Sequence, residues 1–495
     1  MQILYDSTRG GETGIRASQA VLNGLARDGG LYVPSSFPKL DVSLGSLAEM
    51  DYREVAFQVM KLFLTDYTEE ELRCCITHAY DDKFDVPEIA PLHQADGSWF
   101  LELFHGRTIA FKDMALSILP YLMTTAAKKN QIKNEICILT ATSGDTGKAA
   151  MAGFADVPGT QIIVFFPKDG VSPVQKRQMV TQKGENTHVV AINGNFDDAQ
   201  TGVKKLFGDR ELEEEMDRHG IQFSSANSIN IGRLVPQAAY YVYAYSRLVK
   251  AGKIQAGDPI NVTVPTGNFG NILAAYYAKQ TGLPIRKLIC ASNENKVLFD
   301  FFSTGIYDKN RPFILTSSPS MDILVSSNLE RLIYLICGED SEKTKELMEE
   351  LKTTGKYTIT PEMKEKLADF AAGYSTEEET AESIHDTYQK TGYVMDTHTA
   401  VAAHVCGQYR AKSGDQTKCV IASTASPYKF VKSVMSAIDA ENANADEFDL
   451  LPKLQEVSGV PMPQAIKDIL DAKVLHDLEC DADKMKDTVK GILGV

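Results

Sequence analysis

Apolar residues along most of the chain alternate between short compact runs and longer segments in which they recur at helical spacing. The compact runs, which we predict as buried strands, lie at residues 135–140, 162–166, 188–192, 261–264, 287–290 and 418–423. Helical patterns follow several of these runs, for example at 148–154 and 197–207. Such alternation is typical of parallel sheets that carry helices on both faces. The chain is therefore predicted to be an α/β protein with doubly wound parallel sheets.

Two regions depart from this alternation. Residues 1–95 are predicted to form a mostly helical unit, in which Thr68 and Glu71 make a capping box at the start of one helix. Residues from about 328 to 391 are charged and carry helix start signals, so we predict a helical insertion there. The predicted division is an N-terminal unit at 1–95, a small mobile domain at 135–214, and a large domain formed by 96–134 and 215–495, which includes the insertion.

Composition and charge narrow the classes of function. A chain of 495 residues can hold several apolar cores, and a formal net charge of −15 argues against general affinity for nucleic acid or anionic membrane. The eight cysteines have no CxxC spacing and no histidine at zinc spacing, which predicts reduced thiols and no metal site. The N-terminus lacks a signal-peptide pattern, and no stretch reaches membrane-spanning length. We therefore expect a cytoplasmic protein.

Lys112 is the strongest single candidate for chemistry. It lies among Ala110, Phe111, Met114 and Ala115, where a helical apolar pattern begins, so folding should remove it at least partly from water. Desolvation disfavours the ammonium form and lowers the pKa of a lysine, which frees an amine that can form a Schiff base. The alternative is a lysine whose stem lies on apolar surface while its amine stays in water.

Two loops that follow predicted strands have the composition of anion sites. The loop TATSGDTGKAAM at 140–151 combines hydroxyls, glycines and a helix N-terminus, which suits a phosphate or a carboxylate, although a turn without a ligand is an equal alternative. A nucleotide-binding P-loop is disfavoured, because Ala149 stands where a hydroxyl should bind magnesium. In VPTGNFGNILAAYY at 264–277, Gly267 and Gly270 let backbone amides approach a phosphate in front of a helix.

Two further segments offer side chains to a ligand. CVIASTASPYKF at 419–430 ends a strand in neutral hydroxyls, which can hydrogen-bond a pyridine nitrogen without protonating it, or can simply form a serine-rich turn. In SSANSINIGRLVPQAAYY at 224–241, Asn230 and Arg233 are three residues apart and could clamp an anionic group from one helix face. A helix cap beside a surface charge is the alternative for that pair.

The motifs HGRTIAFKD, TSGDTG, PTGNFGN and STASPYKF occur in this order and resemble the threonine synthase family. That family belongs to the tryptophan-synthase-β-like, fold type II pyridoxal-phosphate enzymes. The opening YDSTRGGETGIRASQAVLNGLARDGGLYVP and the segment DTHTAVAAHV are similar to the same family, so the resemblance extends over nearly the whole chain. Two positions depart from its usual pattern: Arg107 stands where proline is usual, and Lys148 stands where serine is common. Both departures add positive charge near the expected site.

The resemblance implies a role for each motif. Lys112 would be the Schiff-base lysine and the proton shuttle, the large domain would bind pyridoxal 5'-phosphate, and the small domain would bind the substrate. The residues implied for the cofactor phosphate are Gly267, Asn268, Phe269, Gly270 and Asn271, with Thr424 facing the pyridine nitrogen. Those implied for the substrate are Ser143, Asp145, Thr146, Asn230 and Arg233.

The implied activity is a lyase reaction of threonine biosynthesis, which converts O-phospho-L-homoserine and water to L-threonine and phosphate. The resemblance further implies that substrate binding moves the small domain toward the large one. A related phospho-lyase, or a serine or threonine dehydratase that yields a 2-oxo acid, shares the early chemistry and stays an alternative. A non-catalytic ligand-binding protein of the same fold is a second alternative. Either a monomer or a homodimer is expected, without nucleic-acid or membrane partners.

Overall fold

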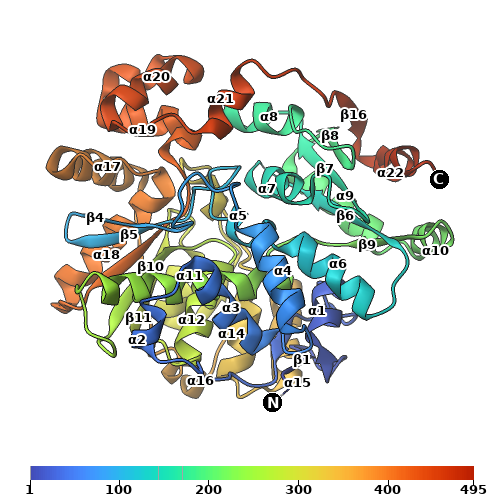
Figure 1. Ribbon diagram of the computed structural model, residues 1–495, viewed down its shortest axis with the longest axis horizontal. Helices are drawn as coiled ribbons and strands as arrows, with labels where there is room; N and C mark the ends of the chain where they lie inside the picture. The colour runs from blue at the N-terminus through green and yellow to red at the C-terminus, as the bar shows by residue number, and fades with distance from the viewer. Residues whose placement is uncertain (1, 143, 170) are drawn as a thin grey trace.

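Two parallel sheets lie side by side in the computed structural model, which describes residues 2–142, 144–169 and 171–495 (Figure 1). Except for the β4/β5 pair, every strand pair in them is parallel. The larger sheet has the order β14 (Phe370–Tyr374), β11 (Ile285–Ser292), β10 (Ile260–Pro265), β15 (Cys419–Ser423), β5 (Ser98–Glu102), β4 (Leu92–Ala95). The smaller sheet has the order β16 (Leu478–Asp481), β8 (Thr187–Asn193), β7 (Thr160–Pro167), β6 (Glu135–Ala141), β9 (Ile221–Ser224). The predicted α/β class is confirmed.

The central strands are apolar runs because helices cover both faces of each sheet. Every residue of β10 and of β15 is buried. The large sheet packs against two sets of helices. One set is α11 (Ile231–Lys250), α12 (Gly270–Gln280) and α13 (Val297–Thr304), and the other is α17 (Glu377–Thr391), α18 (Thr397–Ser413) and α19 (Val431–Ile438). Nearly the whole circumference of α11 is buried, as expected of a helix that runs through the interior.

The small sheet carries helices of its own and joins the large domain through α5 (Asp113–Leu116) and α6 (Leu119–Lys129). Its helices are α7 (Asp145–Phe154), α8 (Pro173–Val180), α9 (Phe196–Phe207), α10 (Arg210–Arg218) and α22 (Met485–Leu493). The carboxyl end of β6 leads directly into α7. A loop at that end therefore lies toward the large domain, where ligands of such sheets bind.

The N-terminal unit is mostly helical, as predicted, and packs on α11 within the same apolar core as the large domain. It comprises β1 (Leu4–Ser7), β2 (Ile15–Arg16), α1 (Ala17–Asn23), β3 (Tyr32–Pro34), α2 (Leu44–Leu47), α3 (Tyr52–Phe63) and α4 (Glu69–Ala79). The capping box of Thr68 and Glu71 at the start of α4 is confirmed. The three strands form a small antiparallel sheet with the order β2, β1, β3.

The insertion at 328–391 is less helical than its charged pattern predicts. It contains α14 (Leu329–Ile336), α15 (Ser341–Thr354), α16 (Pro361–Glu365) and α17, but also β13 (Lys356–Thr358) and β14. β13 pairs with β12 (Ile306–Asp308), and β14 forms the edge of the large sheet. The sequence FAAGY of β14 has few of the β-branched residues that mark a strand, so only its pairing with β11 reveals it.

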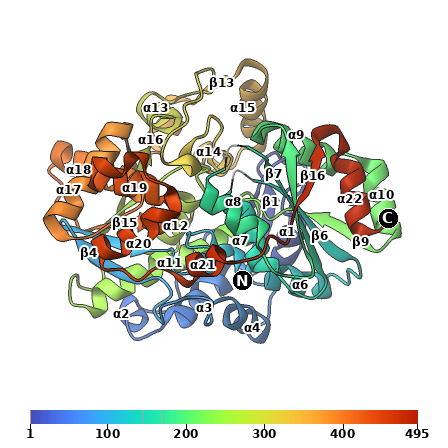
Figure 2. The same ribbon diagram turned by 90° about the horizontal axis from the view of Figure 1, so that it is seen from above.

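The chain crosses back to the small sheet near its C-terminus. After α20 (Glu447–Ser458) and α21 (Gln464–Leu470), an extended segment leads to β16, which pairs with β8, and then to α22 (Figure 2). The small sheet therefore includes β9 and β16 in addition to strands from the 135–214 segment, although both strands fall in the segment predicted for the large domain. None of the helices in the described ranges has the length and apolarity needed to cross a membrane.

Candidate functional site

Lys112 lies at the carboxyl ends of two neighbouring strands of the large sheet, β5 and β15. The segments that leave these strands stay paired: the Phe111 N–H donates to the Thr424 carbonyl at 2.8 Å, and the Ser426 N–H donates to the Ile109 carbonyl at 3.0 Å. This pairing holds Lys112 at the start of α5, and its side chain is only 11% exposed. The alternative of an amine in bulk water does not describe this lysine.

The amine of Lys112 has two polar partners among the described residues. Nζ donates to Ser320 Oγ at 3.1 Å and lies 3.3 Å from Asp145 Oδ2. Burial lowers the pKa of Lys112, and the positive charges of Lys429 and Arg233 lower it further, whereas Asp145 acts in the opposite direction. The predicted depression of this pKa by desolvation therefore agrees with its surroundings. A lysine with a lowered pKa supplies the neutral amine that nucleophilic and base chemistry requires.

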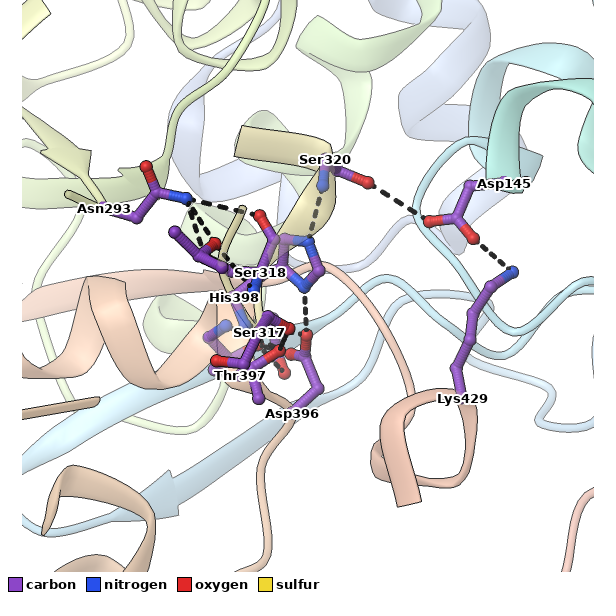
Figure 3. Close-up of polar contacts among 12 residues, drawn as sticks. Asp145, Asn293, Ser317, Ser318, Ser320, Asp396, Thr397, His398 and Lys429 are labelled. Carbon is purple, nitrogen blue, oxygen red and sulfur yellow. Dashed lines mark hydrogen bonds and ion pairs between the residues drawn. The ribbon is translucent and has the colours of Figure 1, made fainter. Parts of the chain in front are cut away.

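Asp145 joins the two domains at this point (Figure 3). It begins α7 of the small domain, and its Oδ1 lies 3.0 Å from Lys429 Nζ and accepts a bond from Gln175 Nε2 at 2.8 Å. Its Oδ2 accepts a bond from Ser320 Oγ at 3.2 Å. Burial alone would raise the pKa of Asp145, but Lys429 and Lys112 hold it well below its usual range. Asp145 is therefore ionised and in contact with the amine of Lys112.

The 264–271 loop has the geometry of a phosphate cradle. Phe269 adopts a left-handed conformation, with φ 65°, and precedes α12 without a side-chain cap, which leaves the first N–H groups of this helix for another acceptor. A Cβ on Gly267 would come within 2.4 Å of the Ser320 carbonyl, so only glycine fits there. Nδ2 of Asn271 is buried and has no partner in the described part of the chain.

Two tyrosines fix the orientation of that free amide. The hydroxyl of Tyr240 donates to Asn271 Oδ1 at 2.9 Å, and Tyr241 donates to the same oxygen. Since the oxygen is engaged, the amide must present its NH₂ group to the cradle. A buried donor without a partner costs free energy unless a ligand accepts its hydrogen bond. The Asn271 amide, the uncapped helix and the Gly267 backbone together fit the phosphate of pyridoxal phosphate.

The other predicted cofactor residues occupy different positions around this cradle. The Asn268 carbonyl accepts bonds from the backbone and side chain of Asn328, each at 3.0 Å, which ties the loop to the start of α14. Gly270 is the first residue of α12, and the nearest atom to a Cβ there would be Asn328 Nδ2, at 3.4 Å. Thr424 is almost fully buried beside Lys112. Its contact with a pyridine nitrogen stays a prediction.

Asn230 and Arg233 are both buried, so the alternative of a surface charge does not hold for Arg233. Asn230 caps α11 by accepting the Gly232 N–H at 2.8 Å, and its amide donates to the Val21 carbonyl at 2.9 Å. Arg233 donates to the Ala226 carbonyl at 2.7 Å, while its Nε has no partner in the described ranges. Burial lowers the pKa of Arg233 to about 10. Asn230 is engaged in the fold, whereas Arg233 keeps a buried donor for an anion.

The 140s loop brings a further cation to the site. Ser143 lies outside the described residues, and Thr142 Oγ1 accepts the N–H groups of Gly144 and Gly147 at 3.0 and 2.9 Å. Thr146 is half-buried on the first turn of α7. Lys148 contacts Gln182, and burial together with Lys429 lowers the pKa of Lys148 to about 7.

Several residues of the site were not assigned a role from the sequence. They are Ser320, Lys429, Gln175 and His398, which come from four separate segments. Lys429 and His398 lie inside motifs that carried the resemblance, and a lysine in the apolar context of SPYKF could have marked the first of them. Ser320 and Gln175 lie in segments without chemical signals. Only the fold brings them to Lys112 and Asp145.

Comparison with known proteins agrees with this geometry. Residues 4–80 match the family model described as threonine synthase N terminus, residues 84–424 match pyridoxal-phosphate dependent enzyme, and residues 399–489 match threonine synthase, C-terminal. Threonine synthase-like 1 of Homo sapiens is 40% identical over 457 residues, which cover 90% of this chain. The chain spans 61% of the length of that relative.

Two proteins named threonine synthase match along their whole length. The protein from Schizosaccharomyces pombe is 38% identical over 96% of this chain and 99% of its own. The crystal structure of PLP-bound threonine synthase from Brucella melitensis superposes with a TM-score of 0.87 at 35% identity and covers 99% of both chains. The chain thus belongs to the threonine synthase family of pyridoxal-phosphate-dependent enzymes, the fold type II group that its motifs resemble.

Proposed function

We propose that this protein is a threonine synthase, which converts O-phospho-L-homoserine and water to L-threonine and phosphate. The observation that carries the proposal is the set of buried cations around the amine of Lys112. Lys429 is fully buried, Arg233 is 2% exposed, and Lys148 lies close enough for Lys429 to lower its pKa. Asp145 is an ionised carboxylate that contacts Lys429 and Lys112. Such an excess of buried positive charge is costly unless an anionic ligand compensates it.

The cations and the cradle divide the work of binding. The family's cofactor is pyridoxal phosphate, and its phosphate fits the 264–271 loop, where backbone amides and Asn271 are the donors. The substrate side would comprise Ser143, Asp145, Thr146, Asn230 and Arg233, as the resemblance implies, together with Lys429. A substrate with both a carboxylate and a phosphate matches this cation-rich side better than an unphosphorylated amino acid does.

The amine of Lys112 would bind the aldehyde group of pyridoxal phosphate and would later transfer protons to and from the substrate. When bound, pyridoxal phosphate supplies an electron sink for negative charge at the substrate α-carbon. Because its pKa is lowered, the amine of Lys112 can remove the α-proton and return a proton later. Asp145 and Ser320 hold Nζ in place during these transfers. Buried Lys429 and Arg233 would stabilise the departing phosphate.

The experiment is incubation of the full-length protein with O-phospho-L-homoserine and pyridoxal phosphate, with phosphate and threonine measured together. We expect equal amounts of both products. Lys112→Ala should lower the rate by about 10³-fold or more, because it removes both the cofactor attachment and the proton carrier. Lys128→Ala, which changes an exposed lysine at the end of α6, is the matched control and should leave the rate unchanged.

The same assay separates the alternatives. Phosphate released with 2-oxobutanoate in place of threonine would assign a phospho-lyase, and deamination of serine or threonine without phosphate release would assign a dehydratase. Neither product from any of these substrates, in a protein that stays colourless with pyridoxal phosphate, would assign a non-catalytic binding protein. Each of these outcomes contradicts the proposed activity.

The proposal includes a motion of the small domain. Asp145 belongs to the small domain, whereas its partners Lys112, Ser320 and Lys429 belong to the large one, so the site is complete only when the domains lie close together. Substrate binding is therefore expected to draw the 135–214 segment toward the large sheet. Solution scattering with and without a substrate analogue should show a smaller radius of gyration for the complex, and identical profiles would contradict the motion.

The proposal also covers the cellular compartment and the oligomeric state of the protein. All eight cysteines are free thiols, and six of them are buried members of the three apolar cores, which supports a reducing compartment such as the cytoplasm. Fractionation of the source cells would test this. A monomer or a homodimer is proposed as the functional unit, and light scattering of the purified chain distinguishes the two.

A further inference from the structure

The amine of Lys112 is held by a hydroxyl that no sequence motif marked. Ser320 Oγ accepts a bond from Lys112 Nζ at 3.1 Å and donates to Asp145 Oδ2 at 3.2 Å. It therefore lies between the two charged groups and touches both. Ser320 belongs to a short 3-10 turn, Pro319–Met321, that reaches over the site from the large domain. How this turn is fixed decides where the hydroxyl points.

A buried histidine fixes the turn from behind (Figure 3). The backbone N–H of Ser320 donates to His398 Nε2 at 3.1 Å, and His398 Nδ1 lies 2.8 Å from Asp396 Oδ2. A backbone N–H can only donate, so Nε2 must be the unprotonated nitrogen, and Nδ1 must carry the proton and donate to Asp396. His398 is 3% exposed and Asp396 is fully buried. The imidazole is thus held as one neutral tautomer.

Asp396 has little freedom to move. It caps α18, accepting the N–H groups of His398 and Thr399 at 3.0 and 3.1 Å, and it also accepts the Thr399 hydroxyl. The turn is gripped at its other end as well, because Thr397 Oγ1 donates to the Ser317 carbonyl at 2.7 Å. The first residues of α18 therefore anchor both ends of the segment that carries Ser320. The start of α18 therefore fixes the position of the Ser320 hydroxyl beside the amine of Lys112.

The same turn touches the phosphate cradle. The Ser320 carbonyl lies where a Cβ on Gly267 would come within 2.4 Å of it. Its hydroxyl faces Lys112 while its carbonyl backs the cofactor loop, so a displacement of this one residue disturbs both parts of the site. This double contact explains why the turn needs an anchor outside the site.

We propose that Ser320 is a positioning residue that orients the Lys112 amine toward its reaction partners, and that the buried His398–Asp396 pair sets the position of Ser320 through its backbone N–H. The inference rests on the proposed function only in taking Lys112 as the reacting amine. Charged groups that act on this amine are Asp145 from α7, Lys429 from the turn after β15, and Arg233 from α11. Ser320 is the neutral member of the set, and it favours the ammonium form by accepting its proton in a hydrogen bond.

The test measures Lys112 directly in the full-length protein after removal of the cofactor. Acetic anhydride labels neutral amines, and peptide mass spectrometry over a pH series gives the pH of half-maximal labelling of Lys112, with exposed Lys128 as internal reference. Ser320→Ala should move this pH downward by about 0.5 to 1 unit, because the ammonium loses an acceptor. Ser320→Thr keeps the hydroxyl and should leave it near the wild-type value.

Two histidine variants separate positioning from general support of the fold. In His398→Gln the side-chain oxygen can still accept the Ser320 N–H, whereas in His398→Asn the shorter amide can bond Asp396 but cannot reach Ser320. We expect His398→Asn to shift Lys112 labelling like Ser320→Ala, His398→Gln to behave like wild type, and the double variant of Ser320→Ala with His398→Asn to match Ser320→Ala alone. Thermal unfolding of each variant confirms that it is folded.

The labelling shifts of the Ser320 and His398 variants decide the inference. Absence of a shift in Ser320→Ala, or equal shifts in His398→Gln and His398→Asn, would overturn the inference. In the cofactor-loaded enzyme the same variants should lower kcat while leaving KM within about twofold, since the amine and not the substrate pocket is disturbed. The labelling series does not depend on which product the enzyme makes. A protein that makes no threonine would refute the proposed function alone, and an unshifted Lys112 would refute this inference alone.

Discussion

The two halves of the candidate site offer different groups to an anion. The 264–271 loop of the large domain uses backbone N–H groups, a left-handed Phe269 and one oriented amide, Asn271, and no ionised side chain is among its donors in the described structure. The opposite half, which includes the 140s loop, contains the buried cations Lys429 and Arg233 together with Lys148, and the carboxylate of Asp145 contacts Lys429. Binding at the 264–271 loop would depend on close geometric fit, whereas binding at the opposite half would depend on the balance of charge.

This difference suits the two ligands. A cofactor phosphate that stays through many turnovers gains from a rigid cradle, because preorganised donors do not have to be reordered for binding. The proposed substrate carries both a carboxylate and a phosphate and would leave as two products, so it would gain from side chains that can exchange partners. Asp145 provides such a partner, since it neutralises the cations while no substrate anion is bound. Cofactor affinity at the cradle should therefore respond to added side-chain volume. Anion affinity at the cation side should respond to changes of charge.

The largest effect is expected from adding one methyl group to the cradle. Gly267→Ala places a Cβ within 2.4 Å of the Ser320 carbonyl, which belongs to backbone and cannot rotate away. The affinity for pyridoxal phosphate, measured by its absorption during titration, should fall about tenfold to a hundredfold. Gly270→Ala is the matched control, because its Cβ would lie 3.4 Å from the Asn328 amide, and it should change the affinity by less than about threefold. Equal losses in the two variants would contradict a cradle shaped by close approach.

A smaller effect is expected from removing the charge of Asp145. Asp145→Asn keeps the shape of the side chain but leaves Lys429 without its carboxylate, so an added anion should bind more tightly. The affinity of cofactor-loaded protein for sulfate, measured by calorimetry, should rise about tenfold. Asp169→Asn, which changes an exposed carboxylate of the same domain, serves as control. Unchanged sulfate binding in Asp145→Asn would show that the carboxylate does not occupy the place of a ligand.

The smallest effect concerns pH. Burial and the nearby charge of Lys429 lower the pKa of Lys148 to about 7, so this lysine gains its charge as the pH falls through that value. Sulfate keeps its own charge over this range, and its affinity for wild type should therefore rise about threefold to tenfold between pH 8 and pH 6. Lys148→Met should flatten this dependence, whereas Lys176→Met, on the exposed side of α8, should preserve it. A pH dependence that survives Lys148→Met would assign the titration to another group.

Sequence reasoning recovered the parts of the fold that have strong local signals. The strands β6, β7, β8, β10, β11 and β15 follow the predicted apolar runs, and their loops meet at one site as expected of parallel sheets. It did not recover β14 or β16, which carry no β-branched residue and lie at sheet edges. An edge strand pairs with only one neighbour, so its hydrophobic pattern is weak and only the tertiary structure reveals its pairing.

The site shows the same division. Lys112 and the glycines of the 264–271 loop are evident from the sequence, because a lysine in an apolar helix start and a strand-glycine-helix pattern have chemical meaning on their own. Ser320 has none: it is one serine in a polar segment, and only the fold brings its hydroxyl to Lys112 and its N–H to His398, 78 residues away. Asn230 was predicted for the substrate, and the structure shows its amide engaged in capping α11.

The sequence by itself determined the class of fold and was enough to predict Lys112 as the reacting lysine and the 264–271 loop as the phosphate cradle, since each prediction rests on residues adjacent in the chain. The tertiary structure alone decided which cations surround the amine, how Asp145 bridges the two domains, and which hydroxyl contacts Lys112. The physical reason is that burial and electrostatics depend on distances in space, and the groups that set them here come from segments hundreds of residues apart.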